Sequence, residues 1–250
     1  MREWICGRNP VFEVLRAARR HVFRMRLAEG AQESGRLGEI LQMARAKKLP
    51  VERVPRPALE ALASGHQGVA LEASGYPYCS LPDILDNSLQ RGEPLFVLLL
   101  DTLQDPQNLG TLLRTAEVSG VHGVLLPFRR TATITPAVVH ASSGASEHLL
   151  VAQANLAQSI AALKEAGAWV VGLESGEGGL PPEEVRLDGP LALVVGSEGE
   201  GMRSLVRDSC DLLLRLPMRG QVGSLNAAVA GSIALYFAWQ ARGYSGRLKS

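Results

Sequence analysis

The feature that most constrains the fold of this chain is a series of short, continuous apolar runs between residues 95 and 216. The six runs are LFVLLL (95–100), GVLLP (123–127), HLLVA (148–152), WVVGL (169–173), LALVV (191–195) and LLLRL (212–216). None of them alternates polar and apolar residues, so each predicts a strand that is covered on both faces. Segments with helical periodicity separate the runs. This alternation predicts an α/β domain, a parallel sheet with helices on both faces.

The helices expected around these strands cover residues 111–119, 136–142, 156–166, 202–208 and 225–240. Asn155 is a typical N-cap, Gly167 a typical helix stop and Pro136 a typical first helical residue. Ligands bind at the carboxyl ends of the strands in such sheets. The loops that follow the strands are therefore expected to hold the chemistry.

The first 75 residues show a different pattern and predict a second, smaller α/β domain. Its expected elements are a helix at 11–19, a strand at 22–27, a helix at 35–48 and strands at 51–54 and 68–72. Residues 76–93 are rich in Pro, Gly, Ser and Asp, which predicts a linker with a short helix at 81–89. The predicted division is 1–75, a linker at 76–93, and 94–250.

The charge of the chain is unevenly distributed, although its net value is only +1. Residues 1–73 hold 13 Lys and Arg against 8 Asp and Glu, a net charge of +5, and the remainder holds 13 against 17, a net charge of −4. A basic small domain suits a polyanionic partner. Charge alone fits a solvated basic face equally well.

Hydropathy and residue spacing exclude several classes of protein. No apolar run reaches the roughly 18 residues of a membrane span, and the first residues lack the apolar centre of a secretory signal. An Arg-rich transit peptide is a minor alternative, because Glu3 and Glu13 interrupt it. The three Cys and five His are isolated in the sequence, which predicts no metal site and a reducing compartment. A cytoplasmic protein without membrane or metal is expected.

The first polar strand-to-helix junction is LLLDTLQDPQNLGTLLRTAEVSG, residues 98–120. Its turn places Asn108 near the start of a helix and Arg114 in the first turns, where free backbone amides favour a phosphate. A capped helix with a surface arginine explains the same pattern, so the junction alone leaves both interpretations open.

The second junction, LALVVGSEGEGM at 191–202, is rich in glycine. Gly196, Gly199 and Gly201 permit positive φ or a close approach of backbone to a ligand, and Glu198 lies near a helix N-terminus. The order GxxGxG differs from the dinucleotide fingerprint GxGxxG, which disfavours a nicotinamide enzyme. A plain flexible turn stays possible here.

The third junction is LRLPMRGQVGSLNAAVAG, residues 214–231. A strand is expected to end at Leu216, and the last helix is expected to start with Ser224 as its N-cap, a contribution of about 1 kcal/mol. Capping by Ser224 leaves Asn226 unexplained, because Asn is a poor residue inside a helix. A binding role for this helix end is therefore predicted.

Three segments in this order, DPQNLGTLLRTAEVSG, VVGSEGEGM and LPMRGQVGSLNAAVA, resemble the signature motifs of the SpoU (TrmH) family of RNA ribose 2'-O-methyltransferases. This resemblance covers about the last 155 residues. The segments ICGRNPVFEVLRA and GHQGVALEA resemble the family's small substrate-binding domain. The subgroup with this arrangement includes bacterial enzymes that methylate a guanosine ribose in large-subunit ribosomal RNA.

The resemblance implies S-adenosylmethionine as cofactor, bound in a C-terminal trefoil knot. It places Gly196, Leu216 and Leu225 at cofactor contacts, with Leu173 near the adenine. It also assigns Arg114 to activation of the 2'-hydroxyl. The residues expected around that arginine are Asn108, Glu198, Ser224 and Asn226. A guanidinium is a poor base because its pKa exceeds about 12. We therefore expect Arg114 to orient the adjoining phosphate and stabilise the developing alkoxide.

The basic N-terminal domain is then expected to hold RNA phosphates. Its candidate residues are Arg8, Arg16, Arg19, Arg20 and Arg24. Few aromatic residues accompany them, so recognition of folded RNA shape is expected.

The last helix is apolar on almost every face, from Ile233 to Trp239. The resemblance implies a homodimer through this region, and a helix fully buried within one chain is the alternative. Three other functions stay open: a transfer RNA methyltransferase, an inactive RNA-binding or ribosome assembly protein, and a nucleotide-dependent enzyme of the doubly wound type.

Overall fold

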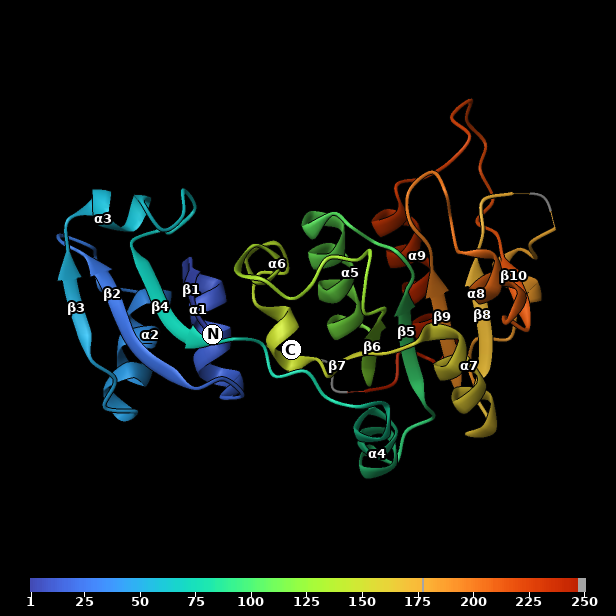
Figure 1. Ribbon diagram of the computed structural model, residues 1–250, viewed down its shortest axis with the longest axis horizontal. Coiled ribbons are helices and arrows are strands. Elements are labelled where there is room, and N and C mark those ends of the chain that lie inside the picture. The colour runs from blue at the N-terminus through green and yellow to red at the C-terminus, as the bar shows by residue number, and fades with distance from the viewer. Residues whose placement is uncertain (177, 247–250) are drawn as a thin grey trace. The chain divides into compact units, whose positions relative to one another are not determined.

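Residues 1–176 and 178–246 are described by this computed structural model (Figure 1). They form two units. The first contains residues 1–77 together with 133–148, and the second contains residues 78–132 and the described residues from 149 onward.

The first unit is built on a four-stranded sheet in the order β1-β4-β2-β3. Its strands are β1 Arg2–Cys6, β2 Val22–Ala28, β3 Val51–Val54 and β4 Val69–Ser74. Strand β4 runs antiparallel to both β1 and β2, while β3 is parallel to β2. The sequence pattern missed β1, because REWIC begins with two charged residues and only its end is buried.

The helices of this unit are α1 Arg8–Ala17, α2 Arg36–Ala46, α3 Arg56–Glu60 and α6 Pro136–Ala141, with a 3-10 turn η1 at Ala145–His148. The segment 133–148 lies within the predicted C-terminal domain at 94–250, but in the structure it groups with the first unit. Val138 and Val139 are fully buried, and a Cβ on Gly144 would lie 2.6 Å from the Cβ of Glu13 on α1. The segment therefore packs into the first unit, although both its neighbours in sequence belong to the second.

The second unit contains a six-stranded, all-parallel sheet in the order β10-β8-β9-β5-β6-β7. Its strands are β5 Phe96–Leu100, β6 Gly123–Leu126, β7 Val151–Gln153, β8 Trp169–Leu173, β9 Leu191–Val195 and β10 Leu212–Leu214. The predicted α/β class and parallel sheet are confirmed. All residues of β5 and β9 are buried, as their uninterrupted apolar sequences require.

Helices cover both faces of this sheet. They are α4 Leu81–Arg91, α5 Pro106–Val118, α7 Leu156–Glu165, α8 Ser204–Asp208 and α9 Ala227–Ala241, with a 3-10 turn η2 at Pro182–Glu184. Apolar residues of α4, α7 and α8 share one core cluster with side chains of β5, β8 and β9. Helices α5 and α9 pack together, and a Cβ on Gly231 of α9 would lie only 2.6 Å from Leu112 of α5. Gly231 thus permits a close crossing of the two helices.

Several helix starts differ from the sequence prediction, and two of these differences concern the polar junctions. Helix α5 begins at Pro106, five residues earlier than expected, because the Asp105 carboxylate accepts hydrogen bonds from the amides of Gln107 and Asn108. Helix α9 begins at Ala227, and its N-cap is Asn226 instead of Ser224. The Asn226 Oδ1 accepts from the amides of Ala228 at 2.9 Å and Val229 at 3.1 Å. The predicted cap at Ser224 is therefore wrong.

Candidate functional site

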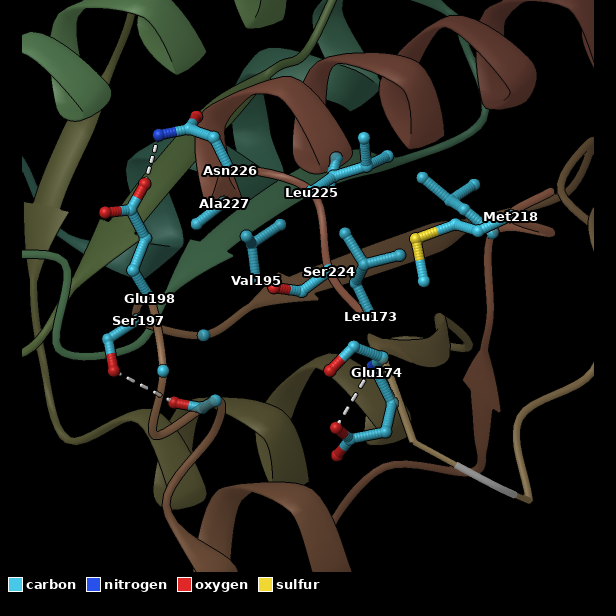
Figure 2. Close-up of a pocket in the computed structure, with 16 residues that line it drawn as sticks. Leu173, Glu174, Val195, Ser197, Glu198, Met218, Ser224, Leu225, Asn226 and Ala227 are labelled. Atoms are coloured by element: carbon cyan, nitrogen blue, oxygen red, sulfur yellow. Dashed lines mark hydrogen bonds between the residues drawn. The ribbon is translucent and has the colours of Figure 1, made fainter. Parts of the chain in front are cut away.

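A cavity of about 430 Å³ opens at the carboxyl edge of the parallel sheet (Figure 2). The ends of β8 and β9, the segment after β10 and the start of α9 enclose it. All four residues expected at cofactor contacts line it: Leu173, Gly196, Leu216 and Leu225. The cavity lies where open parallel sheets bind their ligands.

The lining of the cavity combines an apolar surface with acidic and hydroxyl groups. Leu173, Val195, Leu216 and Met218 supply the apolar part. The polar residues are Glu174, Ser175, Ser197, Glu198, Ser224 and Asn226. The sequence reasoning missed Glu174, although its place directly after β8 is the signal that could have identified it.

The loop after β9 folds tightly on itself. Ser197 and Gly201 exchange two backbone hydrogen bonds of 3.0 and 3.1 Å, and Gly201 has a φ of 70°. A Cβ on Gly196 would lie 2.2 Å from the carbonyl carbon of Gly201 and 2.3 Å from the amide nitrogen of Met202. The loop's own backbone therefore requires glycine at position 196, a reason that the sequence alone did not provide.

An ion pair between the buried Asp101 and the exposed Arg203 anchors the far end of this loop. Asp101, at the end of β5, is fully buried, and its amide donates to the carbonyl of Val195 at 2.8 Å. The Asp101 carboxylate accepts from the Arg203 amide at 2.8 Å and from its guanidinium at 2.7 and 2.8 Å. These bonds hold the two ends of the 196–202 loop against β5. Neither residue was singled out from the sequence.

Three polar side chains from distant parts of the sequence meet at the rim of the cavity. Asn108 Nδ2 donates to Glu198 Oε1 at 3.1 Å, and Asn226 Nδ2 donates to Asn108 Oδ1 at 3.1 Å. The Asn226 amide also donates to Glu198, as Figure 2 shows. Because the Asn226 Oδ1 also accepts a hydrogen bond from a backbone amide of α9, this side chain both caps the helix and orients the Glu198 carboxylate.

Arg114 is placed differently from the other expected site residues. It is exposed on α5 and does not line the cavity. Six residues separate it from Asn108, which corresponds to about 9 Å along a helix and to a different face of it. A single chain therefore brings Glu198, Ser224 and Asn226 into the lining of the cavity, with Asn108 bonded to Glu198, and leaves Arg114 exposed on α5.

One of the arginines expected to contact RNA is buried. The Arg20 side chain has no exposed surface, and its guanidinium pairs with Glu147 at 2.8 Å and Glu3 at 3.0 Å. These carboxylates keep the pKa of Arg20 raised despite its burial. Arg20 therefore stabilises the first unit, and the prediction that it binds phosphate is wrong.

The other four arginines are at least partly accessible. Arg19 donates to the carbonyls of Glu147 and Pro77 at 3.3 Å, and Arg24 pairs with Glu72 at 2.8 Å. Arg16 lies 3.5 Å from Glu13, and Arg8 bonds the backbone carbonyl of Gln67. Two of these four, Arg16 and Arg24, are thus paired with carboxylates.

The described residues contain neither a cluster of metal ligands nor a helix that could span a membrane. No group of three or more His, Cys, Asp or Glu among them is arranged to hold a metal ion. No helix within residues 1–176 and 178–246 is long and apolar enough to cross a membrane.

Comparisons with known proteins agree with these observations. Residues 95–236 match the model of the SpoU rRNA Methylase family, and residues 4–79 match a domain described as RNA 2'-O ribose methyltransferase substrate binding. The chain is 39% identical over 245 residues to a Bacillus subtilis protein, YacO, which is named as a TrmH family tRNA/rRNA methyltransferase; the match covers 96% of each chain. A similarly named protein of Staphylococcus haemolyticus is 40% identical over 240 residues, covering 95% of both.

Two solved structures share the fold over nearly the whole chain. The SpoU methyltransferase AviRb from Streptomyces viridochromogenes, in complex with AdoMet, aligns with a TM-score of 0.81 at 21% identity, covering 98% of this chain and 92% of that one. An AdoMet-bound rRNA methyltransferase from Sinorhizobium meliloti aligns with a TM-score of 0.77 at 22% identity, covering 96% and 87%. These likenesses concern the fold.

Proposed function

The chain belongs to the SpoU rRNA Methylase family and is an RNA 2'-O-methyltransferase that uses S-adenosylmethionine, and from this premise we propose that it methylates a guanosine ribose of large-subunit ribosomal RNA. The observation that carries the site of methyl transfer is the network of Asn108, Glu198 and Asn226 at the rim of the cavity. The choice of ribosomal RNA rests on the N-terminal domain. The methyl donor and the acceptor hydroxyl would meet at this rim.

The cavity suits S-adenosylmethionine in size and in chemistry. Its volume lies within the range of small-molecule sites, about 300–1,000 Å³. Leu173, Leu216 and Leu225 offer flat apolar contact to an adenine, and Glu174 and Glu198 favour the positive charge of a sulfonium. When bound, the cofactor supplies an electrophilic methyl group. The residues of the chain hold it and exclude water around it.

Transfer requires a ribose 2'-hydroxyl that is held in line with the bond between the sulfonium and its methyl group, and this hydroxyl must lose its proton. The two amide groups fix the Glu198 carboxylate at the rim, where it can accept a hydrogen bond from the hydroxyl. Ser224 is close by as a further hydroxyl in the lining. In our proposal, Arg114 orients the adjoining phosphate and stabilises the developing alkoxide, because a guanidinium retains its proton.

Ribosomal RNA is favoured over transfer RNA by the N-terminal domain. Residues 4–79 match the substrate-binding domain, and the alignment with YacO covers 96% of both chains. The names of those relatives include both tRNA and rRNA, so transfer RNA is the second candidate. The trefoil knot is part of this proposal, because α9 and the 214–226 segment line the cavity together with the glycine loop.

We also propose a homodimer through the outer surface of α5 and α9. A hollow of about 490 Å³ there is lined by Thr111 and Thr115 of α5 and by six residues of α9. Val229, Ile233 and Tyr236 of that helix are 46%, 36% and 50% exposed. A second copy would cover this apolar surface by two-fold symmetry, and it would bring Arg114, which follows Thr111 on α5, to the interface.

Two experiments test these proposals. Methyl transfer from radiolabelled S-adenosylmethionine is measured on unmodified large-subunit ribosomal RNA and on unmodified transfer RNA, followed by mapping of the 2'-O-methyl site. Methylation of transfer RNA alone contradicts the ribosomal assignment.

In the second experiment, Tyr236→Glu is expected to give monomers in light scattering while cofactor binding is retained. A variant that stays dimeric contradicts the proposed interface.

A further inference from the structure

The loop after β6 carries an exposed aromatic side chain that is followed in the sequence by two arginines. This loop, PFRRTA at residues 127–132, is here named the β6 loop. Phe128 is 67% exposed, and Arg129 and Arg130 are exposed as well. Neither arginine forms an ion pair or a hydrogen bond with any residue that the structure describes. The tip therefore presents an aromatic ring beside two positive charges, a combination that suits single-stranded nucleic acid.

The ends of the β6 loop are fixed, so its exposed tip is held in place. Pro127 and Ala132 are buried on either side of the tip. The carbonyl of Leu103 accepts from the Ala132 amide at 2.7 Å and from Thr131 Oγ1 at 3.0 Å. Leu103 is itself buried, five residues before Asn108. The loop is therefore attached to the segment that carries one side chain of the polar network.

The sheet topology determines where the β6 loop lies relative to the cavity. All six strands are parallel, so the loop and the cavity share the carboxyl edge of the sheet. Along that edge the order is the cavity at β8 and β9, then the start of α5 after β5, then the β6 loop. Adjacent strands are about 4.8 Å apart, so β6 lies about 10 Å beyond β9. The β6 loop is thus within a few nucleotides of a ribose at the polar network.

Phenylalanine and arginine together match the chemistry of unpaired RNA. Every base has a π-face that can stack on an aromatic ring, and arginines neutralise the phosphates between bases. In the first unit, Arg20 is buried and Arg24 is paired with Glu72, so these two side chains are not free for this purpose. We propose that Phe128 stacks on an unpaired base beside the methylated ribose, while Arg129 and Arg130 hold the flanking phosphates. This inference rests on the proposed function.

The test uses the full-length protein and a fluorescent oligoribonucleotide of about 12 nucleotides without self-complementarity, within the range of single-strand site sizes. Phe128→Ala is expected to weaken binding by about 5- to 150-fold, and Phe128→Tyr is expected to restore it. The double variant Arg129→Ala/Arg130→Ala should reduce the slope of log K against log salt by about 1.4, since each single-strand phosphate contact contributes about 0.7.

The matched control removes two positive charges from the opposite edge of the sheet. Arg91 and Arg186 are exposed and precede β5 and β9, so Arg91→Ala/Arg186→Ala should leave the salt slope unchanged. Binding of S-adenosylmethionine, measured by calorimetry, should be equal in all variants and shows that the site is intact.

Two results overturn the inference. One is that the β6 loop variants bind the oligoribonucleotide with the affinity and salt slope of the control. The other is that Phe128→Ala breaks a dimer in light scattering, which assigns the ring to a protein interface. If instead the expected binding changes occur but the wild-type protein methylates neither RNA, the proposed function fails and the RNA contact stands.

Discussion

Replacing Asn226 by serine separates two roles that this side chain combines. Its Oδ1 caps α9 through the amides of Ala228 and Val229, and its Nδ2 donates to Asn108 and Glu198. Serine is as good an N-cap as asparagine, but it has no amide to reach the carboxylate. Alanine removes both roles. The two variants therefore differ in stability while sharing the loss of the donor.

The expected sizes of the two effects differ clearly. Asn226→Ala should lower the free energy of unfolding by about 1 kcal/mol, which for a chain of this size corresponds to about 2–4 °C in Tm. Asn226→Ser should melt within about 1 °C of the wild type on the same scale. A hydrogen bond to a charged group contributes about 1.5–3 kcal/mol, so both variants should lose about 10- to 150-fold in kcat/KM if the bond acts in the transition state.

The measurements are thermal melting followed by circular dichroism, calorimetric binding of S-adenosylmethionine, and methyl transfer to large-subunit ribosomal RNA. Asn155 gives a matched control, because it caps α7 through the Gln158 amide and does not line the cavity. Asn155→Ala should lose stability by a similar amount and keep its activity. Wild-type turnover in Asn226→Ser would refute the reasoning, since it would reduce the role of Asn226 to helix capping.

Three further predictions follow from the geometry. Gly196→Ala should weaken S-adenosylmethionine binding by about tenfold or more, because its Cβ would clash with the loop backbone, whereas Gly220→Ala, with open space around it, should bind normally in the same calorimetric assay. Arg20→Ala should cost about 3–5 kcal/mol of stability by leaving the buried Glu147 carboxylate unpaired, measured by urea denaturation; a loss below about 1 kcal/mol would show that this carboxylate is solvated. Burial, aided by the nearby positive charge of an arginine, lowers the pKa of His122 below its ordinary 6.5, so the unfolded chain binds a proton more readily than the folded one. The free energy of unfolding should therefore fall as pH drops below 6.5, and this dependence should weaken in His122→Asn.

The division of the chain illustrates where sequence reasoning stops. The helix at 136–141 was expected from Pro136 and is present. Its membership of the first unit depends on packing of Val138, Val139 and Gly144, partners of which lie more than 100 residues away. A deletion of residues 1–75 would therefore expose this buried segment, and it is a poor test of whether the two units have separate roles.

Local sequence patterns were sufficient to predict the parallel sheet and the edge at which the site lies. Both follow from local patterns: uninterrupted apolar strands must be covered on both faces, and polar residues gathered where three strands end. The resemblance to the SpoU family assigned Leu173, Gly196, Leu216 and Leu225 to the cofactor. In the structure all four line one cavity, since neighbouring parallel strands bring their carboxyl ends together.

The tertiary structure alone decided what the individual polar groups do. Asn226 is the cap because its amide is also held by Glu198 and Asn108, and Ser224 has no comparable partners in the turn before α9. Arg20 is buried because two carboxylates from distant segments surround it, while Arg129 and Arg130 stay exposed at the tip of an anchored loop. Local sequence limits which groups a residue can offer, and only the folded chain determines which partners come within bonding distance.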